Sequence, residues 1–232
     1  MIMDFFQEFS KTEDSLIRQF NEHIFFKNFA KLSESRLKSY LMQKWFLSFN
    51  FVQWYDKAIL GLMDSEAVKV LKEIVEDENP INLPSHREDL LFDLKLIGIS
   101  KKEVLTAKPT KFTLKSLKKL MDLVDYSESN NHDLIVLSAL RVAGEVLVGE
   151  EYRHLVPELE KRFGLTKEKS RFYFPHFKHD RKDSRSGYHT SNFDSILRKL
   201  ISNKSELNIA ERAAKTAFKI KLGFFDQFIP KN

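Results

Sequence analysis

Apolar residues recur at helical spacing almost throughout the chain, three or four positions apart, with polar residues between them. Leu16, Phe20, Ile24 and Phe29 follow this spacing, which predicts a helix whose apolar face turns inward. No β-branched run alternates with polar residues between turns, so the sequence predicts no strand. The predicted helices lie near residues 15–30, 35–62, 65–78, 85 onward, 101–106, 112–126, 132–149, 151–163, 167–184, 190–202 and 205–228.

Local signals mark one helix boundary in particular. Asn79 and Pro80 end the helix that begins at Ser65, because a residue before proline is driven out of helical conformation. Ser85 then predicts an N-cap, with Glu88 three residues later as its capping-box partner. The sequence contains no internal repeat and no linker-like tract. We therefore expect residues 1–232 to form a single helical domain.

Composition narrows the class of protein. Hydrophobic residues make up 42% and charged residues 31% of the 232, a balance typical of globular rather than disordered proteins. The 21 Phe, with only 7 Gly and 6 Pro, favour long helices packed around aromatic layers. The lack of cysteine excludes disulfides, thiolate zinc sites and cysteine nucleophiles. Because the sequence shows neither a secretory signal nor an apolar run of roughly 18 residues, we expect a cytoplasmic protein.

The net charge of +5 is a mild basic excess. The lysine-rich stretches 115–119 and 215–221 place their charges at helical spacing beside Leu, Ala and Phe, as solvated helix faces do. No zinc finger, RNA-binding aromatic signature or basic zipper accompanies them. We therefore expect a small-molecule substrate and neither a nucleic-acid nor a membrane partner.

The first candidate site residues flank the proline-bounded turn. Leu71, Ile74, Val75 and Glu78 follow the i, i+3, i+4, i+7 pattern, which places Glu78 on a buried stripe. Alternatively, Glu78 lies at a solvated helix end. His86 opens the next helix, and the turn can fold it back beside Glu78, although a histidine at a helix start is commonly structural.

Glu145 stands in the segment LIVLSALRVAGEVLV, which is apolar on nearly every face and therefore predicts a central helix. Burying a carboxylate there costs several kcal/mol unless it is paired, protonated or bound to a metal ion. A salt bridge to Arg141, one helical turn earlier, is the alternative to a functional role.

A second cluster lies in the segment FYFPHFKHDRKD. On a helix, His176, Asp180 and Asp183 would fall within about 60° of one another, with His179 at the edge of that face. Imidazole and carboxylate groups at such spacing can share a metal ion, as in dimetal helical bundles. The alternative is a solvated polar face, because Lys and Arg residues surround the cluster. No Ser–His–Asp arrangement or Gly-rich phosphate loop competes with these candidates.

Taken together, these segments resemble the haem-oxygenase-like diiron oxidases and oxygenases, relatives of thiaminase II and pyrroloquinoline-quinone synthase. The resemblance covers most of the chain through three stretches: residues 23–51, EDENPINLPSHREDLLFDLKLIGIS and FYFPHFKHDRKD. It implies an all-α, haem-oxygenase-like multi-helix bundle, two Fe ions (or Mn/Fe), O₂ as co-substrate and a homodimer. The implied metal ligands are Glu78, His86, Glu145, His176, Asp180 and Asp183.

The chain departs from the family pattern at Asp183, where the resemblance leads us to expect histidine. Either Asp183 binds the metal, or His179 supplies the nitrogen instead, or the second metal is weakly bound or absent. The leading function is a non-haem dimetal, O₂-dependent oxidase or oxygenase acting on a small organic substrate. The alternatives are a cofactor-less quinone-synthase-like or thiaminase-like enzyme, and a non-catalytic binding protein with a degenerate metal site. Haem oxygenase activity through His23 is a more distant alternative.

Overall fold

A computed structural model describes residues 4–125, 130–180 and 188–229 of the chain. Every regular element in these ranges is helical, as the sequence predicts. The α-helices are α1 (Phe5–Glu22), α2 (Ile24–Lys27), α3 (Glu34–Phe49), α4 (Phe51–Gly61), α5 (Ser65–Glu78), α6 (His86–Leu96), α7 (Lys101–Thr106), α8 (Lys111–Leu123), α9 (His132–Leu140), α10 (Leu147–Phe163), α11 (Tyr173–His179), α12 (Tyr188–Leu200) and α13 (Lys204–Phe225). Two 3₁₀ helices, η1 (Phe29–Lys31) and η3 (Asp226–Phe228), and a π-helical turn, η2 (Arg141–Val146), complete the set.

Local capping fixes the helix boundaries nearest the site. The Asp64 side chain accepts hydrogen bonds from the first backbone N–H groups of α5, which runs to Glu78 as predicted. The Ser85 side chain accepts from the Glu88 backbone N–H, and the Glu88 carboxylate accepts from the Ser85 N–H. This is the predicted capping box, and it sets His86 as the first residue of α6.

Three predicted helices differ from the observed ones, and the break predicted between residues 149 and 151 is absent because α10 runs through it. The first begins at Phe5, ten residues before the predicted start at residue 15, and ends at Glu22, so Ile24 leaves the inward face and is 49% exposed. The predicted helix 35–62 is divided at Asn50, whose backbone caps α3. The predicted helix 167–184 is reduced to α11, which ends at His179 and leaves Asp180 as its C-cap.

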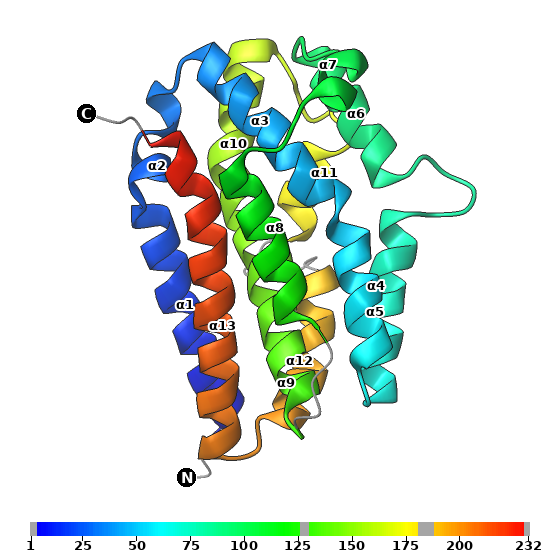
Figure 1. The fold of residues 1–232 in the computed structure, drawn as a ribbon, viewed down its shortest axis with the longest axis vertical. Coiled ribbons are helices and arrows are strands. Elements are labelled where there is room, and N and C mark those ends of the chain that lie inside the picture. The colour runs from blue at the N-terminus through cyan, green and yellow to red at the C-terminus, as the bar shows by residue number, and fades with distance from the viewer. Residues whose placement is uncertain (1–3, 126–129, 181–187, 230–232) are drawn as a thin grey trace.

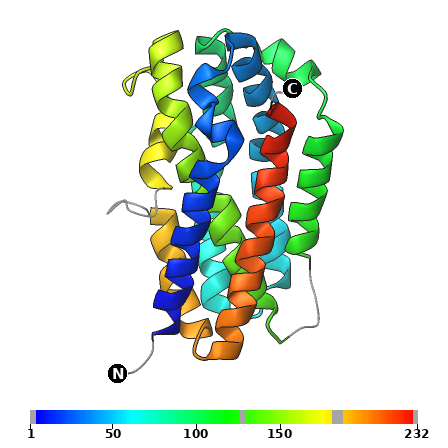
Figure 2. The same cartoon turned by 90° about the vertical axis from the view of Figure 1, so that its left-hand side faces the viewer.

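The bundle is built around one continuous rod of α9, η2 and α10, whose residues are buried on nearly every side over 132–152 (Figure 1). Helix α13 packs against α9, α8 and α1. Helices α1 and α13 run side by side in the same direction (Figure 2). Ion pairs Asp4–Arg198 at one end and His23–Asp226 at the other, with a Thr12–Glu211 hydrogen bond between, join this part of the bundle.

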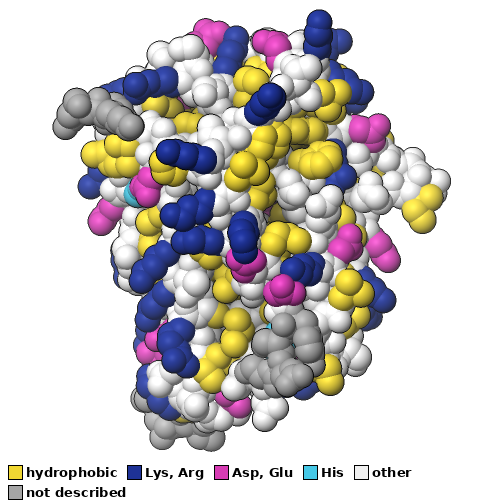
Figure 3. Space-filling model, viewed as in Figure 1, with side chains coloured by type: hydrophobic (Ala, Val, Ile, Leu, Met, Phe, Trp, Pro, Cys, Tyr) yellow, Lys and Arg dark blue, Asp and Glu magenta, His cyan; other side chains and the backbone are white. Residues whose placement is uncertain are grey.

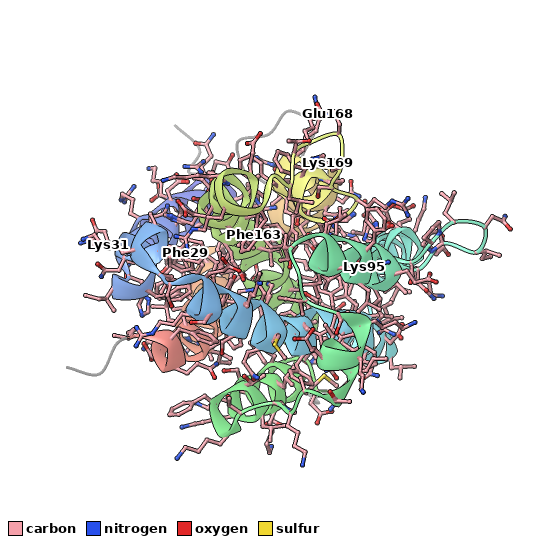
Figure 4. The ribbon with its side chains drawn as sticks, turned by 90° about the horizontal axis from the view of Figure 1, so that it is seen from above. Phe29, Lys31, Lys95, Phe163, Glu168 and Lys169 are labelled. Carbon is pink, nitrogen blue, oxygen red and sulfur yellow. The ribbon has the colours of Figure 1, made fainter. Side chains whose placement is uncertain are left out.

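An aromatic layer closes one end of the bundle, as the Phe content predicts. Phe25 lies at its centre, with ring centroids 5.3 Å from Tyr40 and 5.3 Å from Phe225. Viewed from above this end, Phe29 and Phe163 lie inside the ring of helices, whereas charged residues such as Lys31 stand at its edge (Figure 4). Edge and offset ring contacts of this kind add to the stability that burial alone provides.

Exposed lysines mark the outer helices, where Lys and Arg side chains are interspersed with Asp and Glu (Figure 3). Lys115, Lys118 and Lys119 on α8 are exposed, as are Lys215 and Lys219 on α13, in agreement with the predicted solvated faces. The exception is at residue 221, which is buried. No helix in the described ranges combines the length and the hydropathy that a membrane crossing requires.

Candidate metal centre

The π-helical turn η2 places Glu145 in the middle of the bundle, where 1% of the residue is exposed. The Tyr55 hydroxyl donates a hydrogen bond to Glu145 Oε1. Burial and the negative charge of Glu145 raise the pKa of Tyr55 well above its ordinary value, so the hydroxyl keeps its proton. Gly144 makes this contact sterically possible, because a Cβ atom there would lie 2.6 Å from the Tyr55 oxygen.

Arg141 does not pair with Glu145, which was the alternative explanation for the buried carboxylate. Its guanidinium donates to Glu13 Oε1 over 2.6 Å, to Asp194 and to the backbone carbonyl of Thr190. The buried arginine therefore ties α1 and α12 to η2, and Glu145 Oε2 faces other partners.

Three side chains from separate helices form a first group. Glu78 ends α5, His86 begins α6 and His176 lies in α11. Glu78 Oε1 lies 3.0 Å from His86 Nδ1 and 3.4 Å from His176 Nε2. The two imidazole rings have centroids 4.7 Å apart. One carboxylate and two imidazoles thus converge on one point.

A second group lies deeper in the bundle and consists of Glu145, Asp180 and His189. His189 Nδ1 lies 3.4 Å from Glu145 Oε2 and 3.8 Å from Asp180 Oδ1. All three residues are almost fully buried. His189 stands at the start of α12 and is the only one of the three that sequence analysis did not select.

Hydrogen bonds outside the two groups orient two of the imidazoles. His176 Nδ1 lies 2.8 Å from the Phe172 carbonyl oxygen, which can only accept, so Nδ1 carries the proton and Nε2 faces Glu78. His189 Nε2 lies 3.1 Å from Asp77 Oδ2, so Nδ1 faces the second group. A carboxylate or carbonyl behind each imidazole is the usual support of metal-binding histidine.

The first group holds its charges through mutual attraction. Burial disfavours ionised Glu78, but His176 and His86 outweigh burial and hold the pKa of this carboxylate well below its ordinary value. Burial would also lower the pKa of His176, yet Glu78 and Asp180 raise it to about 9. Without a metal ion, positive charge in this group therefore resides on imidazole.

The second group likewise favours a positive charge on its histidine. Burial opposes protonation of His189, but the negative charge of Glu145 and the hydrogen bond to Asp77 raise its pKa to about 11. Burial raises the pKa of Asp180 to about 7, an effect that nearby Glu145 reinforces. Clustered carboxylates and strongly raised histidine pKa values are frequent features of functional sites.

Both groups open onto one partly open cavity. All six residues line it: Glu78, His86, Glu145, His176, Asp180 and His189. Apolar and aromatic side chains, including Phe51, Trp54, Val148 and Phe172, form much of the remaining wall. A concave apolar pocket with a few converging polar groups is the usual form of a small-molecule site.

The two groups fit divalent metal ions. In each group, one potential ligand atom per residue lies within 4.8 Å of the others. Ligand atoms at about 2.0–2.2 Å from a shared ion lie up to about 4.4 Å apart, so only a slight contraction is needed. Buried Asp180 Oδ1 also has no hydrogen-bond partner among the described residues, which leaves a lone pair for a cation.

The predicted ligands divide differently from the arrangement that sequence spacing suggested. His176 and Asp180 were expected to share one helical face and one ion. They do lie one helical turn apart, since the Asp180 N–H donates to the His176 carbonyl, but their side chains belong to different groups. Asp183 lies outside the described residues, as does the side chain of His179. The structure brings His189 to the second group, the position for which the sequence offered Asp183 or His179.

His23, the haem-ligand alternative, has a structural role. Its Nδ1 caps α2 by accepting from the Phe25 backbone N–H, and its Nε2 lies 3.1 Å from Asp226 Oδ1. The side chain does not line the cavity that holds the six candidate ligands.

Asp93 of α6 anchors the start of α11 and thereby positions His176. This fully buried carboxylate accepts from the Ser170 hydroxyl over 2.6 Å and from the backbone N–H groups of Arg171, Phe172 and Tyr173 over 2.9–3.1 Å. It satisfies backbone donors that a helix start otherwise leaves without partners.

Asp93→Ala is expected to lower the free energy of unfolding by about 3 kcal/mol, because several buried donors lose their acceptor. Asp93→Asn keeps one acceptor oxygen and the side-chain volume, so we expect it to lose about half as much. Urea denaturation of both variants and the parent measures the difference. Equal stability of Asp93→Ala and the parent would show that Asp93 does not anchor the start of α11.

No family model and no curated protein matches the sequence. Solved structures do match. A CADD-like protein of unknown function from Nostoc punctiforme is 15% identical, with a TM-score of 0.75 over 96% of each chain. A domain of unknown function with a heme oxygenase-like fold from Shewanella denitrificans is 13% identical, with a TM-score of 0.72 over 96% of this chain and 89% of that one. A TenA homologue from Pseudomonas syringae is 12% identical, with a TM-score of 0.72 over 96% and 91%.

These likenesses show the fold. The chain has the all-helical, haem-oxygenase-like fold that the sequence resemblance predicted. Identities this low carry no activity with them, because one fold hosts many functions.

Proposed function

We propose that this haem-oxygenase-like bundle binds two divalent metal ions, iron or manganese with iron, and uses O₂ to oxidise a small organic substrate. The observation that carries the proposal is the pair of ligand groups on one cavity. Two histidines and one carboxylate, as in the Glu78 group, are the ligand set of many non-haem Fe(II) oxygenases. The carboxylate-rich Glu145 group suits a second hard cation.

The chemistry that the bound metal pair would supply is the donation of electrons to O₂. The chain's own residues prepare the site for it. Tyr55 holds one oxygen of Glu145 and Asp77 fixes the orientation of His189. The apolar wall formed by residues such as Phe51 and Phe172 limits water at the ligand groups. The cavity mouth gives a small molecule access to them.

The test begins with elemental analysis of protein purified without chelators, followed by anaerobic titration of metal-free protein with Fe(II). We expect two ions per chain, and a transient visible absorption band once O₂ is admitted. Mn(II) in place of Fe(II) controls for binding without oxidation. Protein that binds neither ion would contradict the proposal and favour a cofactor-less enzyme or a non-catalytic protein on this fold.

Metal binding is also expected to release protons. The raised pKa values of His176, about 9, and His189, about 11, mean that both imidazoles are protonated at pH 7 in metal-free protein. Metal-bound histidine must lose that proton, so affinity should fall as pH falls, by about tenfold per unit for each proton released. Calorimetry with Mn(II) in buffers of different ionisation enthalpy counts the protons. An affinity that does not change between pH 6 and 8 would count against these ligands.

A further inference from the structure

Two lysines and one glutamate form a buried charged cluster on the wall of the same cavity. Lys44 of α3 and Lys221 of α13 are each 4% exposed, and Glu151 of α10 is fully buried. Glu151 Oε2 lies 2.9 Å from Lys44 Nζ and 3.4 Å from Lys221 Nζ. Both lysines line the cavity that the candidate metal ligands line. The sequence analysis had assigned Lys221 to a solvated face.

The cluster holds more positive than negative charge. Glu151 is shared by two ammonium groups, and its other oxygen accepts from the Tyr40 hydroxyl. Lys221 Nζ also donates to a neutral group, the Ala143 carbonyl, over 3.3 Å. Burial and the neighbouring charge of Lys44 lower the pKa of Lys221 to about 8. An additional anion beside the two ammonium groups would offset the repulsion between their positive charges.

The cationic cluster lies close to the metal-ligand groups. The Ala143 carbonyl that Lys221 contacts is two residues before Glu145, within the same π-helical turn. Apolar side chains, among them Leu47, Phe51 and Val148, line the same cavity. If two divalent ions fill the ligand groups, their charge exceeds that of Glu78, Glu145 and Asp180, and the cavity becomes more positive still.

We propose that Lys44 and Lys221 bind the carboxylate of a small substrate whose apolar body lies along the cavity wall, within reach of the metal-ligand groups. A carboxylate offers one oxygen to each ammonium group, and such charge-assisted hydrogen bonds are strong in a buried site. The assignment of this carboxylate to the substrate rests on the proposed oxidase function. The anion site itself requires only the lysines and the cavity.

The test compares an acid with its uncharged analogue, 3-phenylpropanoate against 3-phenylpropan-1-ol, by calorimetry at pH 7. Metal-free and Mn(II)-loaded proteins are titrated separately. We expect both forms of the parent to bind the acid at least about tenfold more tightly than the alcohol. Lys221→Met and Lys44→Met are each expected to reduce that preference to about threefold or less. Lys219→Met, on the exposed face of the same helix, is the matched control and should retain it.

Thermal unfolding of the same variants separates an anion site from a purely structural cluster. Lys221→Met leaves Lys44 and Glu151 as a balanced pair, so we expect it to unfold at or above the temperature of the parent. A parent with no preference for the acid, or variants that keep the preference, would overturn the proposal. A parent protein that binds metal but shows no preference for the acid would refute the anion site alone and leave the oxidase function standing. Acid preference in protein that binds no metal would refute the oxidase function and leave the anion site standing.

Discussion

His189→Ala is expected to bind one metal ion per chain where the parent binds two. Among the described residues, His189 is the sole nitrogen donor of the Glu145 group, so its loss leaves Glu145 and Asp180 there without an imidazole. We expect affinity at this position to fall by more than about 100-fold, beyond the usual effect of losing an outer partner of a ligand. The Glu78 group keeps all three of its side chains. Mn(II) titration followed by calorimetry or electron paramagnetic resonance measures the two positions.

Asp183→Ala is the matched comparison, because sequence analysis had assigned a ligand role to Asp183. If His189 rather than Asp183 binds the second ion, Asp183→Ala should still bind two ions. His23→Ala, which alters a structural histidine outside the cavity, controls for general loss of imidazole. Two bound ions in His189→Ala together with one in Asp183→Ala would reverse the assignment.

Arg141→Met is expected to lower the free energy of unfolding by about 3–5 kcal/mol, the usual cost of breaking a buried ion pair. Glu13, 1% exposed, would lose hydrogen bonds of 2.6 and 3.3 Å while it remained buried. The backbone carbonyl of Thr190 would also lose the guanidinium that holds it. Because Thr190 follows His189, affinity for the second ion should fall as well.

The double variant Glu13→Gln, Arg141→Met provides the control. It removes the buried negative charge together with its partner, and we expect it to recover most of the lost stability. Chemical denaturation of the parent, the single variant and the double variant gives the comparison. A single variant within about 1 kcal/mol of the parent would show that the network is dispensable.

Periodicity predicted most helices and the candidate residues that stand on them. Glu78 was selected as a candidate ligand because it falls on an apolar stripe. The Ser85 capping box correctly placed His86 at the start of a helix. Glu145 was recognised because its helix is apolar on almost every face. Each of these signals is local, since it depends on residues within a few turns of the same helix.

His189 could not be found by such reasoning. It lies beyond the end of α11, and helical phase does not carry across a break to the next helix. Its tertiary neighbours, among them Asp77 and Glu145, distinguish it from a structural histidine. Lys221 is a different case, because the sequence did contain a signal that this lysine is buried. It lies two residues after exposed Lys219, about 200° around the helix, and so on the opposite face.

Under the proposed function, the order of the candidate ligands along the chain constrains when metal can be acquired during biosynthesis. Glu78 and His86 precede the central helix, whereas His176 and His189 follow it. A nascent chain that has emerged only as far as Glu145 lacks the later histidines and therefore completes neither ligand group. Neither proposed metal site could then template the early helices as they leave the ribosome, and the aromatic layer is likewise incomplete until Phe225 has emerged. Metal binding as proposed would therefore be a late step in biosynthesis, since both ligand groups are complete only after His189 has emerged.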